Sequence, residues 1–349
     1  MLFYLSSLLQ NFFGPARLLQ SYAVLISLAL YTGFFASVLL IPRLCGWLPQ
    51  DRGREFSINA EAAKGKPTGT GIIFISICVI IVFFFAPLNI SQIILLVLTW
   101  LAMQTGFLDD RSAVSWGEYR KGILDLAISF AASVTLYYLR EPLFWLPFIS
   151  GPIAIHPAVF IAISTAILWI SINTTNCTDG VDGLSGTLAL IALIAMGVIF
   201  YFIMGHVDIS RYLLVPHLED GAQWAVIIFA FCGCLMGYLW HNAYPSKVLM
   251  GDAGSRALGF FIGVCVMVAG NPFLLLVTST IILVNGGTGL VKVALLRFFK
   301  IRILSSVRFP LHDHMRKNLS WSPTQVLIKF MIMQVLVTIA LLGVFFKIR

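Results

Sequence analysis

Charged residues are scarce in this 349-residue chain: 11% of its residues are Asp, Glu, Lys or Arg, whereas 59% are hydrophobic. Its mean hydropathy is +0.93, and it consists almost entirely of apolar runs of about 18 residues or more, which are typical of membrane spans. The longest polar stretches, 44–69 and 300–322, are too short to form a core. The sequence therefore predicts one membrane-embedded domain over residues 1–349, and we expect no additional soluble domain within it.

Other absences narrow the protein class further. The six cysteines are scattered, without a CxxC pair or a metal-ligand spacing, so we expect reduced thiols. The N-terminus has no basic segment followed by a cleavage site, so no removable signal peptide is expected. A net charge of +8 in a membrane protein indicates topology and contact with lipid headgroups, and no nucleic-acid partner is predicted.

The apolar runs predict an all-α polytopic membrane protein, because runs this long differ from the alternating strands of a barrel. We expect about ten transmembrane helices, near residues 21–43, 70–88, 91–108, 123–140, 157–172, 183–204, 223–240, 255–271, 274–297 and 323–346.

The polar breaks between these runs differ in charge. One set, with the span ends beside it, holds 18 of the 23 Lys and Arg residues. The positive-inside rule makes this set cytoplasmic and places both termini outside. Its members are the loops near 44–69, 109–122, 173–182, 241–254 and 298–322.

Acidic and amide residues cluster in this cytoplasmic set. Asp109 and Asp110 are adjacent, and both stay ionised only beside a cation or strong donors. Magnesium fits, since it takes one or two carboxylates together with substrate phosphates; the alternative is a solvated helix end. Segment 173–184 holds two amides and two carboxylates. Asp179 and Asp182 would share a face of a helical turn, and Gly180 permits close approach of a ligand, whereas a plain connector needs no such composition.

Three further segments carry candidate residues. The Gly-Asp-x-Gly-Ser turn around Asp252 offers backbone N–H groups for phosphate and an acid for a metal; the alternative is helix capping by Asp252 or Ser255. The His-Asp-His segment 312–314 suits anion recognition or proton transfer, or contact with lipid headgroups. The basic segment 64–71 suits a diphosphate or is a flexible loop, and it lacks the P-loop pattern.

Taken together, these motifs resemble the polyprenyl-phosphate N-acetylhexosamine-1-phosphate transferase superfamily, and within it the phospho-N-acetylmuramoyl-pentapeptide-transferases. The resemblance covers the chain from the first cytoplasmic loop to the last span. It rests on Lys-Pro-Thr-Gly-Thr-Gly (66–71), Phe-Leu-Asp-Asp (107–110), Asn-x-x-Asn-x-Thr-Asp-Gly-x-Asp-Gly-Leu (173–184), Met-Gly-Asp-x-Gly-Ser (250–255), Pro-Leu-His-Asp-His (310–314) and Trp-Ser-Pro-Thr-Gln-Val (321–326).

The chain departs from the family pattern at several positions. The family's triple histidine is His-Asp-His here, which puts the role of the middle histidine in doubt. Leu249 stands where an aromatic residue usually precedes Met-Gly-Asp, so uracil stacking there would be lost or supplied elsewhere. The basic residue expected before Pro67 falls near Ala63, which leaves Lys64 or Lys66 as substitutes.

The resemblance implies transfer of phospho-MurNAc-pentapeptide from UDP-MurNAc-pentapeptide to undecaprenyl phosphate, giving lipid I and UMP. It implies Mg²⁺ as cofactor, a homodimer in the bacterial inner membrane in contact with lipid, an active site on the cytoplasmic face, and tunicamycin-like or muraymycin-like ligands. Direct attack by the lipid phosphate and a two-step route through an aspartyl-phosphate both stay open.

The resemblance also implies roles for individual residues. Catalysis is expected from Asp109, Asp110, Asp252 and His312, with Asp109 deprotonating or holding the lipid phosphate. Asp252 and Asp179 are the expected metal ligands. The expected nucleoside or substrate contacts are Asn173, Asn176, Asp179, Gly180, Asp182, Asn242, Leu249, Lys64, Lys66, Thr68, Lys121 and His314.

Two rival functions stay open. A transferase for another UDP-sugar, such as UDP-GlcNAc, would share the chemistry, although the forms of segments 173–184 and 321–326 favour the pentapeptide substrate. A secondary transporter would place its charged residues near the bilayer midplane and within repeated halves. Here the acidic residues gather in one set of loops, and the sequence shows no internal repeat.

Overall fold

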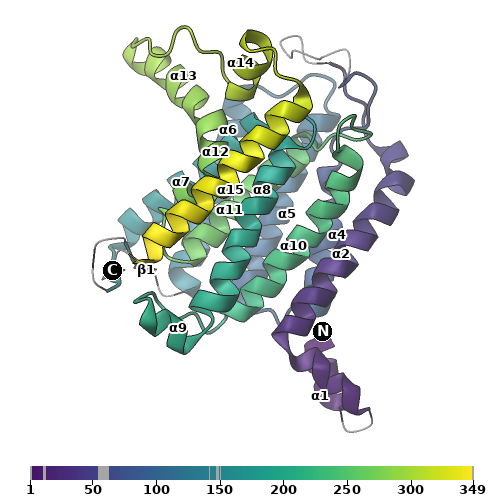
Figure 1. The fold of residues 1–349 in the computed structure, drawn as a ribbon, viewed down its shortest axis with the longest axis vertical. Helices are drawn as coiled ribbons and strands as arrows, with labels where there is room; N and C mark the ends of the chain where they lie inside the picture. The colour runs from purple at the N-terminus through teal and green to yellow at the C-terminus, as the bar shows by residue number, and fades with distance from the viewer. Residues whose placement is uncertain are drawn as a thin grey trace.

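The computed structural model describes residues 2–10, 13–53, 63–140, 142–146, 149 and 151–347. They form a bundle of long helices (Figure 1). Among these residues, nine helices are long and apolar enough to cross a membrane, and the expected span near 70–88 is a shorter apolar helix of 15 residues, Gly71–Phe85. The predicted all-α polytopic membrane fold is confirmed.

The apolar runs become helices, because only internal hydrogen bonding satisfies the backbone of a chain in hydrocarbon. The long helices are α2 (Tyr22–Leu44), α4 (Gly71–Phe85), α5 (Ile90–Arg111), α6 (Glu118–Leu139), α7 (Pro157–Thr178), α8 (Leu184–Val198), α10 (Gly221–Asn242), α11 (Gly251–Val268), α12 (Leu274–Ile282), α13 (Thr288–Phe299) and α15 (Pro323–Lys347). The short elements are α1 (Leu2–Leu9), η1 (Gly14–Gln20), η2 (Cys45–Trp47), β1 (Leu143–Phe144), β2 (Ile153–Ala154), η3 (Ile199–Met204), α9 (Val207–Tyr212), η4 (Leu283–Gly287) and α14 (Leu311–Asn318).

Helix α11 is the centre of the bundle, since all 18 of its residues are buried. It packs against α4, α5, α7 and α8. Glycines bring the helices close: a Cβ on Gly71 would lie 2.1 Å from the backbone nitrogen of Gly254, and one on Gly106 would lie 2.3 Å from the carbonyl oxygen of Asp252. Small residues at helix interfaces allow such close approach in membranes. The first turn of α11, which carries Asp252, is therefore held tightly between α4 and α5.

The two ends of the bundle differ. Figure 1 shows α14 at one end, and α1 and the C-terminal end of α15 at the other. The helices α5, α7 and α10 end, and α6, α8 and α11 begin, at the α14 end. This arrangement matches an even number of spans. The assignment of the α14 end to the cytoplasm stays a prediction from the charge bias.

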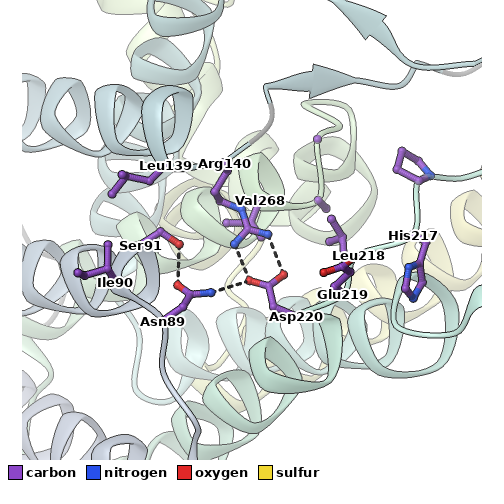
Figure 2. A pocket seen from close by; sticks show the side chains of 13 residues that line it. Asn89, Ile90, Ser91, Leu139, Arg140, His217, Leu218, Glu219, Asp220 and Val268 are labelled. Carbon is purple, nitrogen blue, oxygen red and sulfur yellow. Dashed lines mark hydrogen bonds and ion pairs between the residues drawn. The ribbon is translucent and has the colours of Figure 1, made fainter.

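An ion pair closes the far end of the bundle. Arg140 follows α6 and donates to both carboxylate oxygens of Asp220 at 2.6 and 2.9 Å, and Asn89 donates to Asp220 at 3.2 Å (Figure 2). They line a cavity of 620 Å³. Burial alone would raise the pKa of Asp220, but the hydrogen bonds and charge of Arg140 outweigh it and hold this pKa below its usual value. The pair ties the ends of α5, α6 and α10 together.

Candidate active site

The carboxylate of Asp110 joins the end of α5 to the start of α11. Its two oxygens accept hydrogen bonds from the backbone N–H groups of Asp252 and Ala253, each at 3.0 Å. Gly251 precedes them at φ +71°, and a Cβ there would lie 2.4 Å from Asp110 Oδ2. A carboxylate at a helix N-terminus is stabilised by unpaired N–H groups and by the helix dipole. Capping of α11 by Asp252 or Ser255, the alternative left open by the sequence, is not what the structure shows.

Lys121 brings two buried carboxylates to one point. Its Nζ lies 2.8 Å from Asp252 Oδ2 and also pairs with Asp109 Oδ2. The second oxygen of Asp109 accepts the backbone N–H of Trp116 at 2.6 Å. Asp109 and Asp252 are 6% and 3% exposed. One ammonium therefore faces two carboxylates, which leaves a formal charge of −1 at a point where α5, α6 and α11 meet.

The turn between α7 and α8 packs against the loop before α11. Asn176 donates to Ser255 Oγ at 3.3 Å, one turn of α11 beyond Asp252. Asp182 accepts the backbone N–H of Ser246 at 3.0 Å. Asn242 accepts the N–H of Gly183 and donates to Val248 O, both at 2.8 Å. The structure thus gathers these residues of segment 173–184 around the 241–254 loop.

Two predicted residues of that segment have other surroundings. Asn173 donates to Trp169 O within its own helix at 2.9 Å. Asp179 ends α7, where its N–H donates to Asn176 O at 3.1 Å, and it is half-buried. Their roles as a nucleoside contact and a metal ligand stay predictions.

The first cytoplasmic loop joins the same assembly. Lys66 Nζ donates to Ser246 Oγ at 3.0 Å. Backbone hydrogen bonds tie this loop to its surroundings: Leu249 N–H donates to Pro67 O at 2.8 Å, and the N–H of the buried Thr68 donates to Pro49 O at 2.9 Å. Lys64 is exposed. Of the two lysines that could replace the missing basic residue, Lys66 is the one bonded into the assembly.

His312 lies against Gly180. A Cβ on Gly180 would lie 2.3 Å from His312 Nε2, so this position has room for glycine alone. The amide of Asn285 holds the histidine: its Oδ1 accepts the His312 N–H at 2.8 Å and its Nδ2 lies 3.1 Å from Nδ1. Burial, with a smaller effect of Arg316, lowers the pKa of His312 from 6.5 to about 4. At neutral pH the ring is therefore uncharged.

The two neighbours of His312 differ from it in environment. His314 Nδ1 accepts the backbone N–H of Arg308 at 3.3 Å. Burial raises the pKa of Asp313, although the charges of Arg308 and Arg316 act in the opposite direction. Arg308 Nε lies 3.9 Å from Asp313 Oδ2. The middle residue of the His-Asp-His segment thus faces basic neighbours.

The carboxylates of Asp109 and Asp252 are the candidate ligands for a metal ion. Within the described part of the chain, no group of three or more His, Cys, Asp or Glu side chains could hold a metal. Asp109 Oδ2 and Asp252 Oδ2, however, converge on the Lys121 ammonium. Mg²⁺ needs one or two carboxylates when substrate phosphates and water complete its shell. The donor set therefore suits a cation that is bound together with a phosphorylated substrate.

Comparisons with known proteins identify the family. The model of glycosyl transferase family 4 matches residues 92–270. The phospho-N-acetylmuramoyl-pentapeptide-transferases of two strains of Treponema pallidum are each 60% identical over 346 residues, with 98% of this chain and 95% of theirs covered. The chain belongs to the phospho-N-acetylmuramoyl-pentapeptide-transferase family. A more distant member, from Opitutus terrae, is 30% identical over 355 residues, with 93% of this chain and 94% of its own covered.

The similarity to known family members covers all the residues of the candidate site. The region 92–270 contains Asp109, Lys121 and Asp252. Lys66 and His312 lie outside it, but they fall within the nearly full-length similarity to the treponemal members of the phospho-N-acetylmuramoyl-pentapeptide-transferase family. All of these residues therefore lie within the part of the chain that is similar to known members of the family.

The sequence reasoning missed three residues of the site. Asn285 lies in the π-helical turn η4, and it is the one amide in an apolar run with a Gly-Gly pair after it. An isolated amide in an apolar run is the feature by which the sequence could have indicated that Asn285 belongs to the site. Ser246 and the backbone of Trp116 act through main-chain groups and a hydroxyl in loops, and no pattern of residue types marks them.

Proposed function

We propose that this protein transfers phospho-MurNAc-pentapeptide from UDP-MurNAc-pentapeptide to undecaprenyl phosphate. An oxygen of the lipid phosphate forms a bond to the phosphorus attached to the sugar. The bond from that phosphorus to the bridging oxygen breaks, and UMP leaves with that oxygen and its electron pair. The product is lipid I. The similarity to proteins named for this reaction, 60% identical across nearly the whole chain, supports the proposal.

The observation that carries the chemistry is the cluster of Lys121 with Asp109 and Asp252. The reaction brings an anionic phosphate against an anionic diphosphate, so catalysis depends on positioning and on offsetting charge. Lys121 supplies a positive charge within 2.8 Å of Asp252. It is also partly exposed, at 27% of its side chain, so a phosphate oxygen can reach it. We assign Lys121 to the phosphate groups and Asp109 to the lipid phosphate, which Asp109 would hold or deprotonate.

We also propose that a magnesium ion binds at this cluster. Asp252 would hold the ion, with Asp109 as the second carboxylate that converges on this point. When bound, the ion would offset the negative charge of the diphosphate. Asp252→Asn should raise the magnesium concentration needed for half-maximal UMP release, because one anionic ligand is lost. Near wild-type release by folded Asp252→Ala protein at limiting magnesium would show that the metal assignment is wrong.

The turn between α7 and α8 is the proposed nucleoside side of the site. Asn176, Asp182 and Gly180 gather there with Asn242 and with the uncharged ring of His312. Amides, carboxylates and backbone groups are the partners that a uracil and a ribose require. The nucleoside side would lie beside Asp252, because Asn176 contacts Ser255 in the first turn of α11.

The proposed location follows from the same reaction. The lipid carrier lies in the bilayer and the nucleotide is water-soluble, so we propose a site at the cytoplasmic face of the bacterial inner membrane. The charge bias of the loops supports this orientation. A homodimer is proposed from the family resemblance, and size measurement of the purified protein in nanodiscs tests it.

Competition between nucleotide sugars tests the function. The purified protein in nanodiscs with undecaprenyl phosphate would receive equal concentrations of UDP-MurNAc-pentapeptide and UDP-GlcNAc. We expect UMP release and a lipid product that contains the pentapeptide. A lipid product with N-acetylglucosamine would establish the rival transferase. Substrate movement across a sealed membrane without UMP release would establish a transporter.

A further inference from the structure

A second ion pair lies directly beneath the proposed catalytic cluster. Arg256 of α11 pairs with Asp125 of α6, with Nε 3.1 Å from Asp125 Oδ1 and with Nη2 bonded to the same oxygen. The two residues are 1% and 2% exposed. Removing two charges from water is costly, and apolar residues of similar volume are often as stabilising. Arg256 Nη1 has no hydrogen-bond partner in the described part of the structure. The pair is therefore poorly explained by stability alone.

Its position in the two helices suggests another reason. Arg256 follows Asp252 by four residues on α11, and Asp125 follows Lys121 by four residues on α6. Both helices begin at the α14 end of the bundle and run away from it, so the second pair lies one turn, about 6 Å, deeper than the first. In the upper pair α6 supplies the cation, whereas in the lower pair α6 supplies the anion.

This opposite order of charges selects one register. If α6 moved by one turn toward the α14 end, Asp125 would face Asp252. If it moved by one turn the other way, Lys121 would face Arg256. Either displacement brings like charges together in a buried environment and is disfavoured. The fixing of register is also the best-attested role of buried polar groups. The two pairs together therefore penalise both displacements.

We propose that Asp125 and Arg256 are positioning residues that fix the register of α6 against α11 and so hold Lys121 between Asp109 and Asp252. This inference rests on the proposed function only for its kinetic readout. Both residues lie one helical turn below Lys121 and Asp252 in the sequence of their helices. Their effect on transfer would pass through the location of the Lys121 ammonium.

The first test replaces both charges at once, because a single replacement would leave a buried unpaired charge. In D125L/R256M we expect folded protein, direct binding of UDP-MurNAc-pentapeptide unchanged within about twofold, and kcat lower by roughly 10-fold to 100-fold, since small misplacements of a catalytic group have effects of this size. The matched control is R140M/D220L, which removes the ion pair at the far end of α6 and should leave kcat unchanged. Unchanged kcat in D125L/R256M would overturn the proposal.

A double-mutant cycle separates positioning from a general structural role. If the pair acts through Lys121, adding D125L/R256M to Lys121→Gln should cause little further loss of kcat. A full additional loss in that background would contradict the proposal. If D125L/R256M does not fold, Arg256→Lys, which keeps the charge, tests the same point: it should keep more of the wild-type kcat than Arg256→Met, and equal loss in both would overturn the proposal.

A distance measurement, which needs no turnover, tests the register of α6 against α11 independently of the proposed function. Spin labels at the exposed positions Glu118 and Lys247 report the distance between the start of α6 and the loop before α11. We expect a single narrow distance distribution in the wild type and in R140M/D220L, and a broadened or shifted one in D125L/R256M. An unchanged distribution would refute the register role whatever reaction the protein performs. If the wild type shows no transfer and D125L/R256M shows the expected broadening, the proposed function is refuted and the register role stands.

Discussion

At the scale of single residues, the buried ring of His312 gives the protein a testable pH dependence. Its pKa is lowered from 6.5 to about 4 by burial and by Arg316. Between these values the unfolded chain binds a proton that the folded protein does not bind. The free energy of unfolding should therefore fall as the pH drops from 6.5 to 4, by roughly 3 kcal/mol at full extent. Above pH 6.5 this residue should contribute no pH dependence.

Thermal unfolding in detergent between pH 4 and 7 tests this prediction. The loss of stability on acidification should be smaller in His312→Gln than in the wild type. Asp313, whose pKa is raised, acts with the opposite sign, because its folded form binds protons more readily. The difference between wild type and variant isolates the histidine. Parallel curves for the two proteins would contradict a buried, uncharged His312.

The sequence identified most residues of the site but not what each one contacts. Asp109 and Asp252 could be named because charged residues in an apolar chain need a reason, whereas Lys121 was named only through the family resemblance. That one ammonium would face both carboxylates depends on how α5, α6 and α11 cross, which the spacing within each helix does not encode. Asp110 was predicted as a catalytic residue, and the structure shows its carboxylate bonded to the backbone of α11. Its catalytic role stays a prediction.

At the scale of elements, the link from α5 to α11 through Asp110 can be tested. Asp110→Ala leaves the buried N–H groups of Asp252 and Ala253 without this acceptor. We expect a loss of about 1–3 kcal/mol in stability. Asp110→Asn keeps one acceptor oxygen and should lose less. Thermal unfolding of the purified variants measures both. An unchanged unfolding midpoint for Asp110→Ala together with lost transfer would instead assign Asp110 to the chemistry.

The long helices could be predicted from the sequence, whereas the short elements could not. Runs of apolar residues predict the long helices because the bilayer imposes their length. The helices α9 and α14 have six and eight residues, and β1 and β2 have two each. Such elements are too short for a periodic pattern. Tertiary contacts hold α14, where the backbone of His312 is bonded to Asn285. The π-helical turn η4 is likewise a product of packing.

At the scale of the whole molecule, the proposed function depends on the membrane orientation. The charge bias predicts that α14 and the site face the cytoplasm, with α9 on the other side. Figure 1 shows α9 and α14 at opposite ends of the bundle. Single cysteines at the exposed positions Asp208 in α9 and Lys317 in α14 report their sides, once the six native cysteines have been replaced.

In intact bacterial cells, a membrane-impermeant thiol reagent should label Asp208→Cys and spare Lys317→Cys, and inverted membrane vesicles should show the reverse. The physical reason is the excess of Lys and Arg in the loops at the α14 end, which resist transfer across the membrane. Labelling of Lys317→Cys in intact cells would reverse the topology. It would also separate the site from a cytoplasmic nucleotide sugar, so the proposed function depends on the outcome. The cluster at Lys121 can act on a soluble UDP-sugar only if its end of the bundle faces the compartment that contains it.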